Sequence, residues 1–295
     1  MAKTLLVFGH GYSAAALSST LLPEGWRVIG TTRSAAKLVE MQAMGVEGLR
    51  WPDGANQAEL HHAIQQASHV LLSVAPETTG DPVLAAFGAA LATRGADLAW
   101  LGYLSTTAVY GDHQGGWVDE QTPLTPSTKR GAWRVAAEQA WGALAAQFGL
   151  PLHIFRLAGI YGPGRGPFAK VRAGTARRII KPGQVFSRIH VEDIAAILNA
   201  SIRQPHAGAI YNLCDDLAAP PEDVIGRAAE LLGLPLPPEV DFATADLSPM
   251  ARSFYAESKR VRNDRIKQEL GVVLRYPTYE AGLAALLAEE KRSAK

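Results

Sequence analysis

The stretch Thr4–Ala15 (TLLVFGHGYSAA) decides the fold. An apolar run that ends at Gly9 has the length and composition of a buried strand, and a helical pattern follows from about Ala14. Between them, G-x-G-x-x-A is typical of a tight turn from a strand into a helix. The first glycine permits the turn, the second leaves space for a pyrophosphate, and the small third residue lets the helix pack close to the strand. The helix N-terminus would then direct free N–H groups at the phosphates.

This turn is our prediction for a dinucleotide-binding loop. The residues that we expect to bind the dinucleotide are Gly9, Gly11, Tyr12, Ser13 and Ala14. A plain tight turn without a ligand is the simpler alternative. The same run also approaches the G-x-S-x-G turn of hydrolases. Its last glycine is missing, so Ser13 is better suited to donate to a phosphate than to act as a nucleophile.

Short apolar runs alternate with helical patterns over the first half of the chain. The strand candidates are Thr4–Gly9, Trp26–Thr32, Gly48–Trp51, His69–Val74, Leu98–Thr106 and Leu152–Leu157. The helix candidates between them are Ala14–Leu22, Ala35–Met44, Gln57–Gln66, Val83–Arg94 and Thr128–Phe148. This alternation favours a parallel sheet wrapped by helices, and nearly all-apolar strands fit burial on both faces. We predict an α/β protein of the Rossmann type, with a doubly wound parallel sheet and a smaller C-terminal substrate lobe.

The alternation weakens after about Gly159. The segment Tyr161–Pro167 (YGPGRGP) is predicted to be a loop from its glycines and prolines. Further elements are expected at Val191–Ile202 (helix), Ala209–Leu213 (strand), Glu222–Leu232 (helix) and Thr278–Lys291 (helix). We expect residues 1–160 to form the dinucleotide-binding core and residues 161–295 the smaller substrate lobe, with about 188–214 rejoining the core.

Composition argues against several classes of function. The chain has 295 residues, 47% of them hydrophobic and 19% charged, and a formal net charge of +1. A charge this close to zero gives no overall attraction to nucleic acid or to anionic membranes. Cys214 is the single cysteine, so no internal disulfide or thiolate cluster can form, and the eight histidines do not cluster at ligand spacing. We expect a cytoplasmic protein without a metal, a nucleic-acid partner or a membrane span.

The end of the second predicted strand bears on the choice of nicotinamide cofactor. An NAD site would place Asp or Glu here for the ribose 2′-hydroxyl, and neither occurs from Gly25 to Val39. Thr32, Arg33 and Ser34 instead offer a cation and hydroxyl groups, which suit a 2′-phosphate. We therefore predict NADP rather than NAD. The alternative is that Arg33 is an ordinary solvated loop residue.

Four further segments have the order and spacing of one known group of enzymes. They are Leu104–Asp112 (LSTTAVYGD), Phe155–Gly164 (FRLAGIYGPG), Arg188–Ala195 (RIHVEDIA) and Asn263–Gly271 (NDRIKQELG). Together with the Gly9–Ala14 turn, they make the chain resemble the extended and atypical short-chain dehydrogenase/reductase superfamily, in its NAD-dependent epimerase/dehydratase branch, over nearly the whole length. The resemblance implies a nicotinamide cofactor on the first βαβ unit and a substrate covered by the loop at Tyr161–Pro167.

The resemblance also implies roles for individual residues. Thr106 stands where the family's catalytic serine or threonine donates a hydrogen bond to a substrate oxygen, with Ser105 and Thr107 as close competitors. Ser73 and Ala75 match a stretch that lines the cofactor. The alternative for Thr106 is a strand-end hydroxyl that satisfies a neighbouring backbone group.

The chain departs from the family at its Tyr-x-x-x-Lys pair. The family's helix reads Tyr-x-x-x-Lys-x-x-x-Glu, and counting back from Glu138 places Arg134 at the lysine and Arg130 at the tyrosine. At i, i+4 and i+8, the three share roughly one helical face. An ordinary surface pair between Arg134 and Glu138 is the simpler alternative.

The two arginines imply a changed chemistry. We expect Arg134 to keep the lysine's role of binding the nicotinamide ribose, and Arg130 to orient an anionic group of the substrate. A guanidinium is a very poor proton donor or base near neutral pH, so it cannot replace the tyrosine. The proton would come from water or from another group, and the nearby candidates in the sequence are Tyr110, Tyr161 and His113.

Local charge bears on the substrate. No Asp or Glu occurs from Gln139 through Val191. The cations of that stretch are Arg156, Arg165, Lys170, Arg172, Arg177, Arg178, Lys181 and Arg188. Arginines bind phosphate or carboxylate through paired hydrogen bonds, which fits an anionic substrate, and a solvated basic face explains the same run equally well.

Two functions follow from these observations. The first is an NADP-dependent oxidoreductase or epimerase/dehydratase-like enzyme that acts on a small anionic or sugar-like molecule, and retention of Thr106 favours it. The second is a non-catalytic NADP(H)-binding sensor or regulatory module, which loss of the Tyr/Lys pair favours. The sequence leaves room for a homodimer in either case.

Overall fold

The computed structural model describes residues 3–52 and 57–293. Within them, the centre is a sheet of seven parallel strands in the order β11-β7-β5-β4-β1-β2-β3. The strands are β1 (Thr4–Phe8), β2 (Arg27–Thr32), β3 (Glu47–Arg50), β4 (His69–Leu72), β5 (Trp100–Thr106), β7 (Leu152–Leu157) and β11 (Ile210–Leu213). The order reverses between β1 and β4, so the predicted doubly wound α/β fold is confirmed. Ligands of such sheets bind at the carboxyl ends of the strands beside the reversal.

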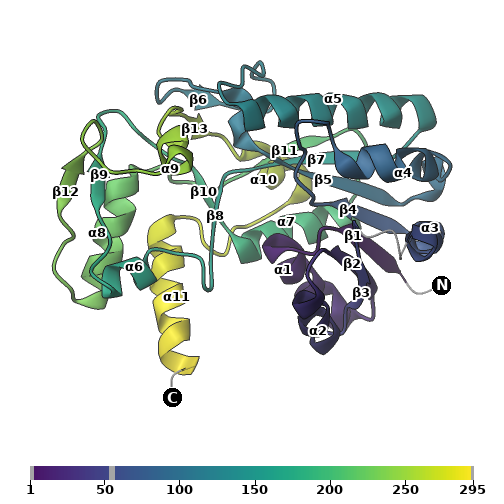
Figure 1. The fold of residues 1–295 in the computed structure, drawn as a ribbon, viewed down its shortest axis with the longest axis horizontal. Helices are drawn as coiled ribbons and strands as arrows, with labels where there is room; N and C mark the ends of the chain where they lie inside the picture. The colour runs from purple at the N-terminus through teal and green to yellow at the C-terminus, as the bar shows by residue number, and fades with distance from the viewer. Residues whose placement is uncertain (1–2, 53–56, 294–295) are drawn as a thin grey trace.

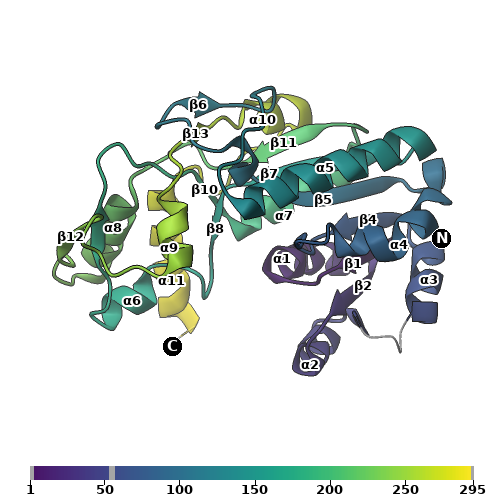
Figure 2. The ribbon, with the colours of Figure 1, turned by 45° about the horizontal axis from the view of Figure 1, so that its top comes forward.

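Helices cover both faces of this sheet (Figures 1 and 2). One face carries α1 (Tyr12–Leu21), α2 (Ala35–Ala43) and α7 (Val191–Arg203), and the other carries α3 (Gln57–Gln66), α4 (Pro82–Ala92) and α5 (Lys129–Phe148). Strand side chains alternate between the two cores, because successive residues point to opposite faces. Leu5 and Val7 are fully buried with α1 and α7, whereas Leu6 and Phe8 are fully buried with Phe87 of α4.

The rest of the C-terminal half forms a second group of elements, on the left in Figure 1. Its strands pair in parallel outside the large sheet: β8 (Gly159–Tyr161) with β10 (Arg188–His190), and β9 (Arg178–Ile180) with β12 (Glu239–Asp241). Its helices are α6 (Phe168–Arg172), α8 (Pro221–Leu232), α9 (Pro249–Phe254) and α11 (Tyr279–Ser293). These elements have an apolar core of their own, which includes Tyr161, Phe168 and Leu283. We refer to them as the lobe.

Two short elements join the lobe to the sheet. The strand β13 (Arg260–Val261) pairs with β6 (Trp117–Val118), and α10 (Asp264–Leu270) packs near β11.

Within the described residues, no helix is both long and apolar enough to cross a membrane, and no cluster of His, Cys, Asp and Glu is suited to a metal ion.

Several predicted boundaries differ from the structure by one or two residues, and two of these bear on the site. The first helix begins at Tyr12, two residues before the predicted start at Ala14, because Gly11 serves as its N-cap. Tyr161 ends β8 instead of opening the following loop. In both cases, nearby glycines predict a turn. Backbone hydrogen bonds nevertheless place Tyr12 in a helix and Tyr161 in a strand.

A buried polar network lies beneath the carboxyl end of β5. Glu138 of α5 and Arg156 of β7 form an ion pair at 2.7 Å, with side chains only 4% and 3% exposed. Ser105 donates to the same carboxylate, and the Tyr110 hydroxyl accepts from Arg156 at 3.0 Å. Glu138 is therefore not part of a surface pair with Arg134, and that alternative is wrong. The network instead joins α5 to β5 and β7.

Breaking this buried ion pair should cost much more stability than breaking an exposed one. Arg156→Met leaves the Glu138 carboxylate buried without its cation, which should lower the free energy of unfolding by about 3–5 kcal/mol. The control is Arg27→Met, because Arg27 and Glu47 pair at 2.6 Å with side chains 39% and 53% exposed. That change should cost less than about 1 kcal/mol. Urea denaturation measures both, and similar losses would contradict the role given to the buried pair.

Candidate active-site cleft

The turn from β1 into α1 has the geometry of a phosphate site. Gly9 has φ +85°, and a Cβ there would lie 2.9 Å from a valine methyl after β4, so another residue does not fit. A Cβ on Gly11 would face open space, its nearest neighbour being a backbone oxygen at 3.8 Å. The N–H groups of Tyr12, Ser13 and Ala14 have no acceptor among the described residues, and the first turn of α1 carries no acid. The turn thus leaves both donors and space for an anion.

The end of β2 presents a free cation. Arg33 is exposed and makes no hydrogen bond or ion pair with a described residue. The hydroxyls on either side are partly engaged: Thr32 accepts from the Ser34 N–H at 3.2 Å, and Ser34 caps α2 by accepting from the Lys37 N–H at 3.3 Å. Arg33 is therefore the group of this segment that is most available to a ligand.

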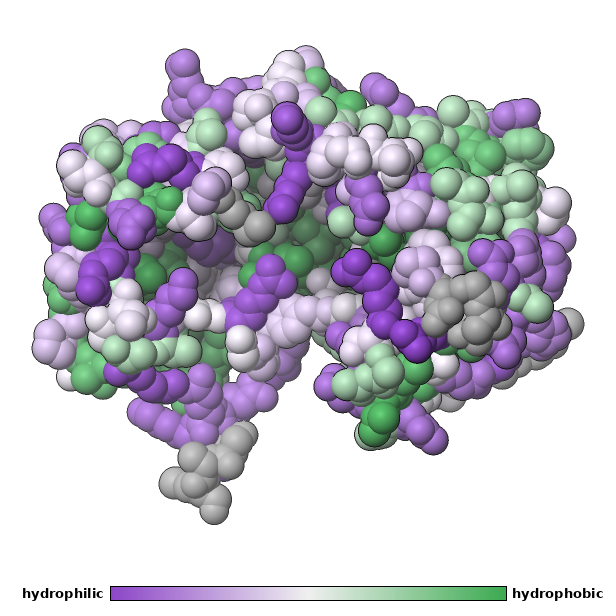
Figure 3. Space-filling model, in the orientation of Figure 1, coloured by the Kyte–Doolittle hydropathy of each residue, from purple (hydrophilic) through white to green (hydrophobic). Residues whose placement is uncertain are grey.

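A cleft of about 1740 Å³ lies between the sheet and the lobe. Figure 3 shows the molecule hollowed between its two halves, with hydrophilic side chains around the opening and apolar ones deeper inside. The predicted site residues that line it are Ser13, Ser73, Ala75, Thr106, Arg130 and Arg134. The other predicted residues, Gly9, Gly11, Tyr12, Ala14, Thr32, Arg33 and Ser34, are not among those that line it. The cleft thus joins the start of α1 to the predicted catalytic positions.

The cleft has a strong excess of positive charge. Among the described residues that line it, eight are Lys or Arg and two are Glu. The cations are Lys129, Arg130, Arg134, Arg165, Lys170, Arg177, Arg188 and Lys259, and the acids are Glu77 and Glu257. The near-neutral chain therefore concentrates cations in one hollow, where field lines focus and an anion is favoured.

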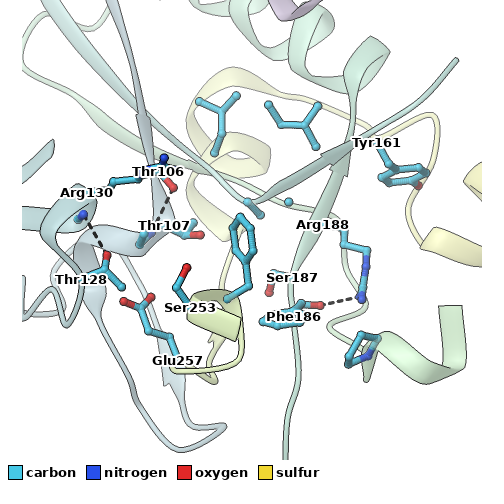
Figure 4. Close-up of a pocket in the computed structure, with 18 of the residues that line it drawn as sticks. Thr106, Thr107, Thr128, Arg130, Tyr161, Phe186, Ser187, Arg188, Ser253 and Glu257 are labelled. Carbon is cyan, nitrogen blue, oxygen red and sulfur yellow. Dashed lines mark hydrogen bonds between the residues drawn. The ribbon is translucent and has the colours of Figure 1, made fainter. Parts of the chain in front are cut away.

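The hydroxyls at the end of β5 separate into two environments. Ser105 is buried and donates to Glu138, so it is not free to bind a substrate. Thr106 and Thr107 both line the cleft (Figure 4), and the Thr106 hydroxyl accepts from the Ala108 N–H at 3.3 Å. That bond leaves the Thr106 O–H to donate, so both readings of Thr106, as a strand-end cap and as a donor in the cleft, are compatible with its position.

The two arginines of α5 differ in their surroundings. The Nη1 atom of Arg134 donates to the Tyr103 hydroxyl at 3.0 Å and to the Leu104 carbonyl at 2.8 Å, which fixes its side chain along the end of β5. Arg130 is exposed and has no hydrogen-bond or ion-pair partner among the described residues. Thr128 caps the helix just before it by accepting from the Gly131 N–H at 3.1 Å. Arg134 is therefore held in place by the end of β5, whereas Arg130 is free to bind a ligand.

Two of the three sequence candidates for a proton donor lie away from the cleft. The Tyr110 side chain is fully buried and donates to Asn212 at 2.7 Å, and His113 contacts the Tyr110 carbonyl through Nε2 at 3.1 Å. Neither lines the cleft. Tyr161 does, but burial, together with Asp215, raises the pKa of its hydroxyl, which makes the phenolate costly to form.

The lobe end of the cleft combines a cation with aromatic side chains. Arg188 donates to the carbonyls of Phe186 at 2.9 Å and Ala219 at 3.1 Å (Figure 4). Phe254, Tyr255 and Tyr279 also line this end. Behind it, Asp215 is buried and its Oδ2 has no partner among the described residues. Burial raises the pKa of Asp215 to about 8, an effect that the positive charge of Arg188 partly offsets.

The structure adds an ion pair that sequence reasoning missed. Glu257 and Lys259 line the cleft, are each 8% exposed, and form an ion pair at 2.7 Å. Lys259 also donates to the Gly111 carbonyl at 2.7 Å, and Glu257 accepts from the Ser127 hydroxyl at 2.6 Å. The pair directly precedes the C-terminal segment that carries part of the resemblance. A charged pair in a loop is also common on a surface, so nothing in the sequence places it in the cleft.

The sequence pattern of the NAD dependent epimerase/dehydratase family matches residues 5–214 of the chain. The chain belongs to this family. The match spans the turn at Gly9, the end of β5 and the segment at Arg188, so the resemblance that these motifs predicted is confirmed.

Individual proteins are also similar to this chain, one in sequence and two in structure. Protein YeeZ of Escherichia coli K12 is 29% identical over 287 residues, which cover 93% of this chain and 97% of YeeZ. The structure of a functionally unknown conserved protein from Silicibacter pomeroyi is 60% identical, with a TM-score of 0.91 and coverage of 98% and 99%. The dTDP-glucose 4,6-dehydratase of Bacillus anthracis in complex with NAD is 18% identical, with a TM-score of 0.79 and coverage of 99% and 97%. This family member therefore shares its fold with that dehydratase.

The buried carboxyl of Asp215 predicts a pH dependence of stability. Its folded-state pKa is about 8, and an unfolded aspartate titrates at about 3.9. Between these values the folded state holds a proton that the unfolded chain has lost, so the free energy of unfolding falls as pH rises from about 4 to about 8. Asp215→Asn should flatten this fall, and Asp246→Asn at an exposed site should not. Urea denaturation across that range is the measurement, and an unchanged slope in Asp215→Asn would contradict the assignment.

Proposed function

We propose that the chain is an NADP(H)-dependent oxidoreductase or epimerase/dehydratase-like enzyme that acts on a small anionic or sugar-like molecule. The observation that carries the proposal is one continuous cleft from Ser13, at the start of α1, to Thr106 and the cationic side chains around it. A cofactor held at α1 and a substrate held in the lobe would meet at the end of β5. The complex of the similarly folded dehydratase with NAD supports a dinucleotide in this position.

The residues at the end of β1 and β2 fit the cofactor. The free N–H groups after Gly11 and the space in front of it suit the pyrophosphate, and Arg33 suits the 2′-phosphate of NADP. Ser73 and Ala75 would lie along the cofactor, and the nitrogens of Arg134 other than Nη1 remain for the nicotinamide ribose. When bound, the nicotinamide supplies or accepts a hydride.

The substrate half of the cleft suits an anion or a hydroxylated molecule. Thr106 can donate its hydroxyl to a substrate oxygen, and Arg130 can form paired hydrogen bonds with a carboxylate or phosphate. Neither group can supply the proton that the family's tyrosine exchanges. Glu257 and Lys259 are the remaining acid–base pair of the described cleft residues, and we assign proton exchange to them or to water that reaches them.

A non-catalytic NADP(H) sensor is the second candidate. The observation that favours it is the exposed arginine at position 130, where the resemblance implies the family's proton-transferring tyrosine. A sensor would bind the cofactor as tightly as an enzyme and would need no proton donor. Turnover, measured below, separates the two.

Cofactor preference tests the role of Arg33. A charge-assisted contact with phosphate contributes about 1.5–3 kcal/mol, so NADPH should bind about tenfold or more tightly than NADH, and Arg33→Ala should remove most of that difference. Gly11→Val is the matched comparison, because its side chain enters the pyrophosphate space and should weaken both cofactors. Calorimetric titration measures the affinities. Equal binding of the two cofactors by the unmodified protein would contradict the choice of NADP.

Turnover tests the chemistry. With a panel of carbonyl and sugar-nucleotide compounds, we expect weak alcohol-dehydrogenase activity, which Thr106→Ala and Arg130→Ala should each lower by about tenfold or more, since each removes a hydrogen bond to substrate. Lys291→Ala, an exposed cation of α11 that does not line the cleft, is the control and should leave kcat unchanged. NADPH oxidation is followed by absorbance, and conversion of the sugar nucleotides by chromatography, because an epimerase or dehydratase regenerates its cofactor. Robust turnover that survives Arg130→Ala would refute the role of that residue, and tight NADPH binding without any turnover would favour the sensor.

A further inference from the structure

The segment after β8 is held directly against the start of α1. Gly162 and Arg165 exchange backbone hydrogen bonds of 3.0 and 2.9 Å and so close a tight turn. The Tyr12 hydroxyl donates to the Pro163 carbonyl at 2.9 Å. Gly162 has φ +154°, and a Cβ there would lie 2.5 Å from the Tyr12 hydroxyl oxygen, so a side chain does not fit. The turn therefore has a defined position over the first residue of α1.

Arg165 extends from this turn over the ring of Tyr12. Its Cζ atom lies 5.7 Å from the ring centroid, and its guanidinium makes no hydrogen bond or ion pair with a described residue. A cation–π contact uses none of the hydrogen-bond donors of the guanidinium, so its five N–H groups stay free for an oxyanion. Arg165 and Ser13, in the first turn of α1, line the same cleft. A free cationic fork thus lies beside unpaired backbone donors.

We infer that Arg165 binds the pyrophosphate of the dinucleotide from the lobe side, opposite the N–H groups at the start of α1. The inference rests on the dinucleotide site proposed above and adds a residue that comes from the other half of the molecule. The two sets of donors are complementary, since the helix offers N–H groups and its positive dipole end, and the arginine offers a full charge and paired hydrogen bonds. The more enclosed Arg188, in contrast, is already bonded to two carbonyls.

This assignment changes the ligand expected for the loop. By resemblance, Tyr161–Pro167 covers the substrate, whereas the position of Arg165 over the Tyr12 ring directs it to the proposed cofactor site. Gly166 and Pro167 follow directly and line the cleft with Lys170 of α6. Pyrophosphate binding by Arg165 would therefore favour one position of the loop at residues 162–167. Because this loop also borders the substrate half of the cleft, binding of the cofactor would change the affinity for the substrate.

The test compares NADPH and NADH, because the two share the pyrophosphate and differ at the 2′-phosphate. Arg165→Ala should weaken both by the same factor of about ten, whereas Arg33→Ala should weaken NADPH alone. Arg165→Lys, which keeps the charge and loses the planar fork, should give a smaller loss. Lys170→Ala is the matched control, an exposed cation of the same cleft on α6, and should change neither affinity. Calorimetric titration at fixed salt gives the values, and thermal melting verifies that each variant is folded.

Each result decides between named alternatives. Unchanged affinities in Arg165→Ala would overturn the inference, and so would an equal loss in Lys170→Ala, which would show a general effect of cleft charge. If the unmodified protein binds both cofactors and Gly11→Val abolishes binding while Arg165→Ala does not, the inference alone fails. If the unmodified protein binds neither cofactor, the proposed function fails together with it.

Discussion

The close approach of β1 to the segment after β4, at Gly9, is the constraint on which the site depends. The backbone turns there with φ +85°, and a Cβ would lie 2.9 Å from a methyl of Val74. Beside it, His10 is buried against Gly30, where a Cβ would lie 2.9 Å from the His10 Cβ. Burial lowers the pKa of His10 to about 4, so the ring is neutral near pH 7. Compact packing of the turn thus sets both the direction of α1 and the position of Ser73 at the cleft.

A second constraint lies under the carboxyl end of β5. Glu138 of α5 pairs with Arg156 in a buried network that reaches Ser105 and Tyr110. On the same helix, Arg130 and Arg134 line the cleft. The buried pair attaches α5 to the sheet, whereas Arg130 on the cleft side of the helix has no partner among the described residues.

The net charge of the sequence does not reveal the cationic cleft, which forms only when the chain is folded. A net charge of +1 predicts no preference for anions, yet eight cations and two acids of the described residues line one cleft. They come from α5, α6, β10, the segments after β4 and β8, and the segments before β9 and β13. Elsewhere, cations are paired with acids, as in the ion pair between Arg203 and Glu24. The field inside the cleft is thus a property of the arrangement and not of the composition.

The sequence by itself determined the βα turn, the alternation of strands and helices, and the family, because each depends on residues adjacent in the chain and on periodicity. It also indicated the arginine pair of α5, by counting from Glu138 along one helix. The tertiary structure decided that Tyr110 lies inside a buried network, that Ser105 is bound to a carboxylate, and that Glu257 and Lys259 reach the cleft. It likewise placed Arg165 on Tyr12, more than a hundred and fifty residues away in the chain. Local patterns fix backbone direction and burial, whereas the meeting of distant side chains depends on how complete elements pack, which no short stretch of sequence encodes.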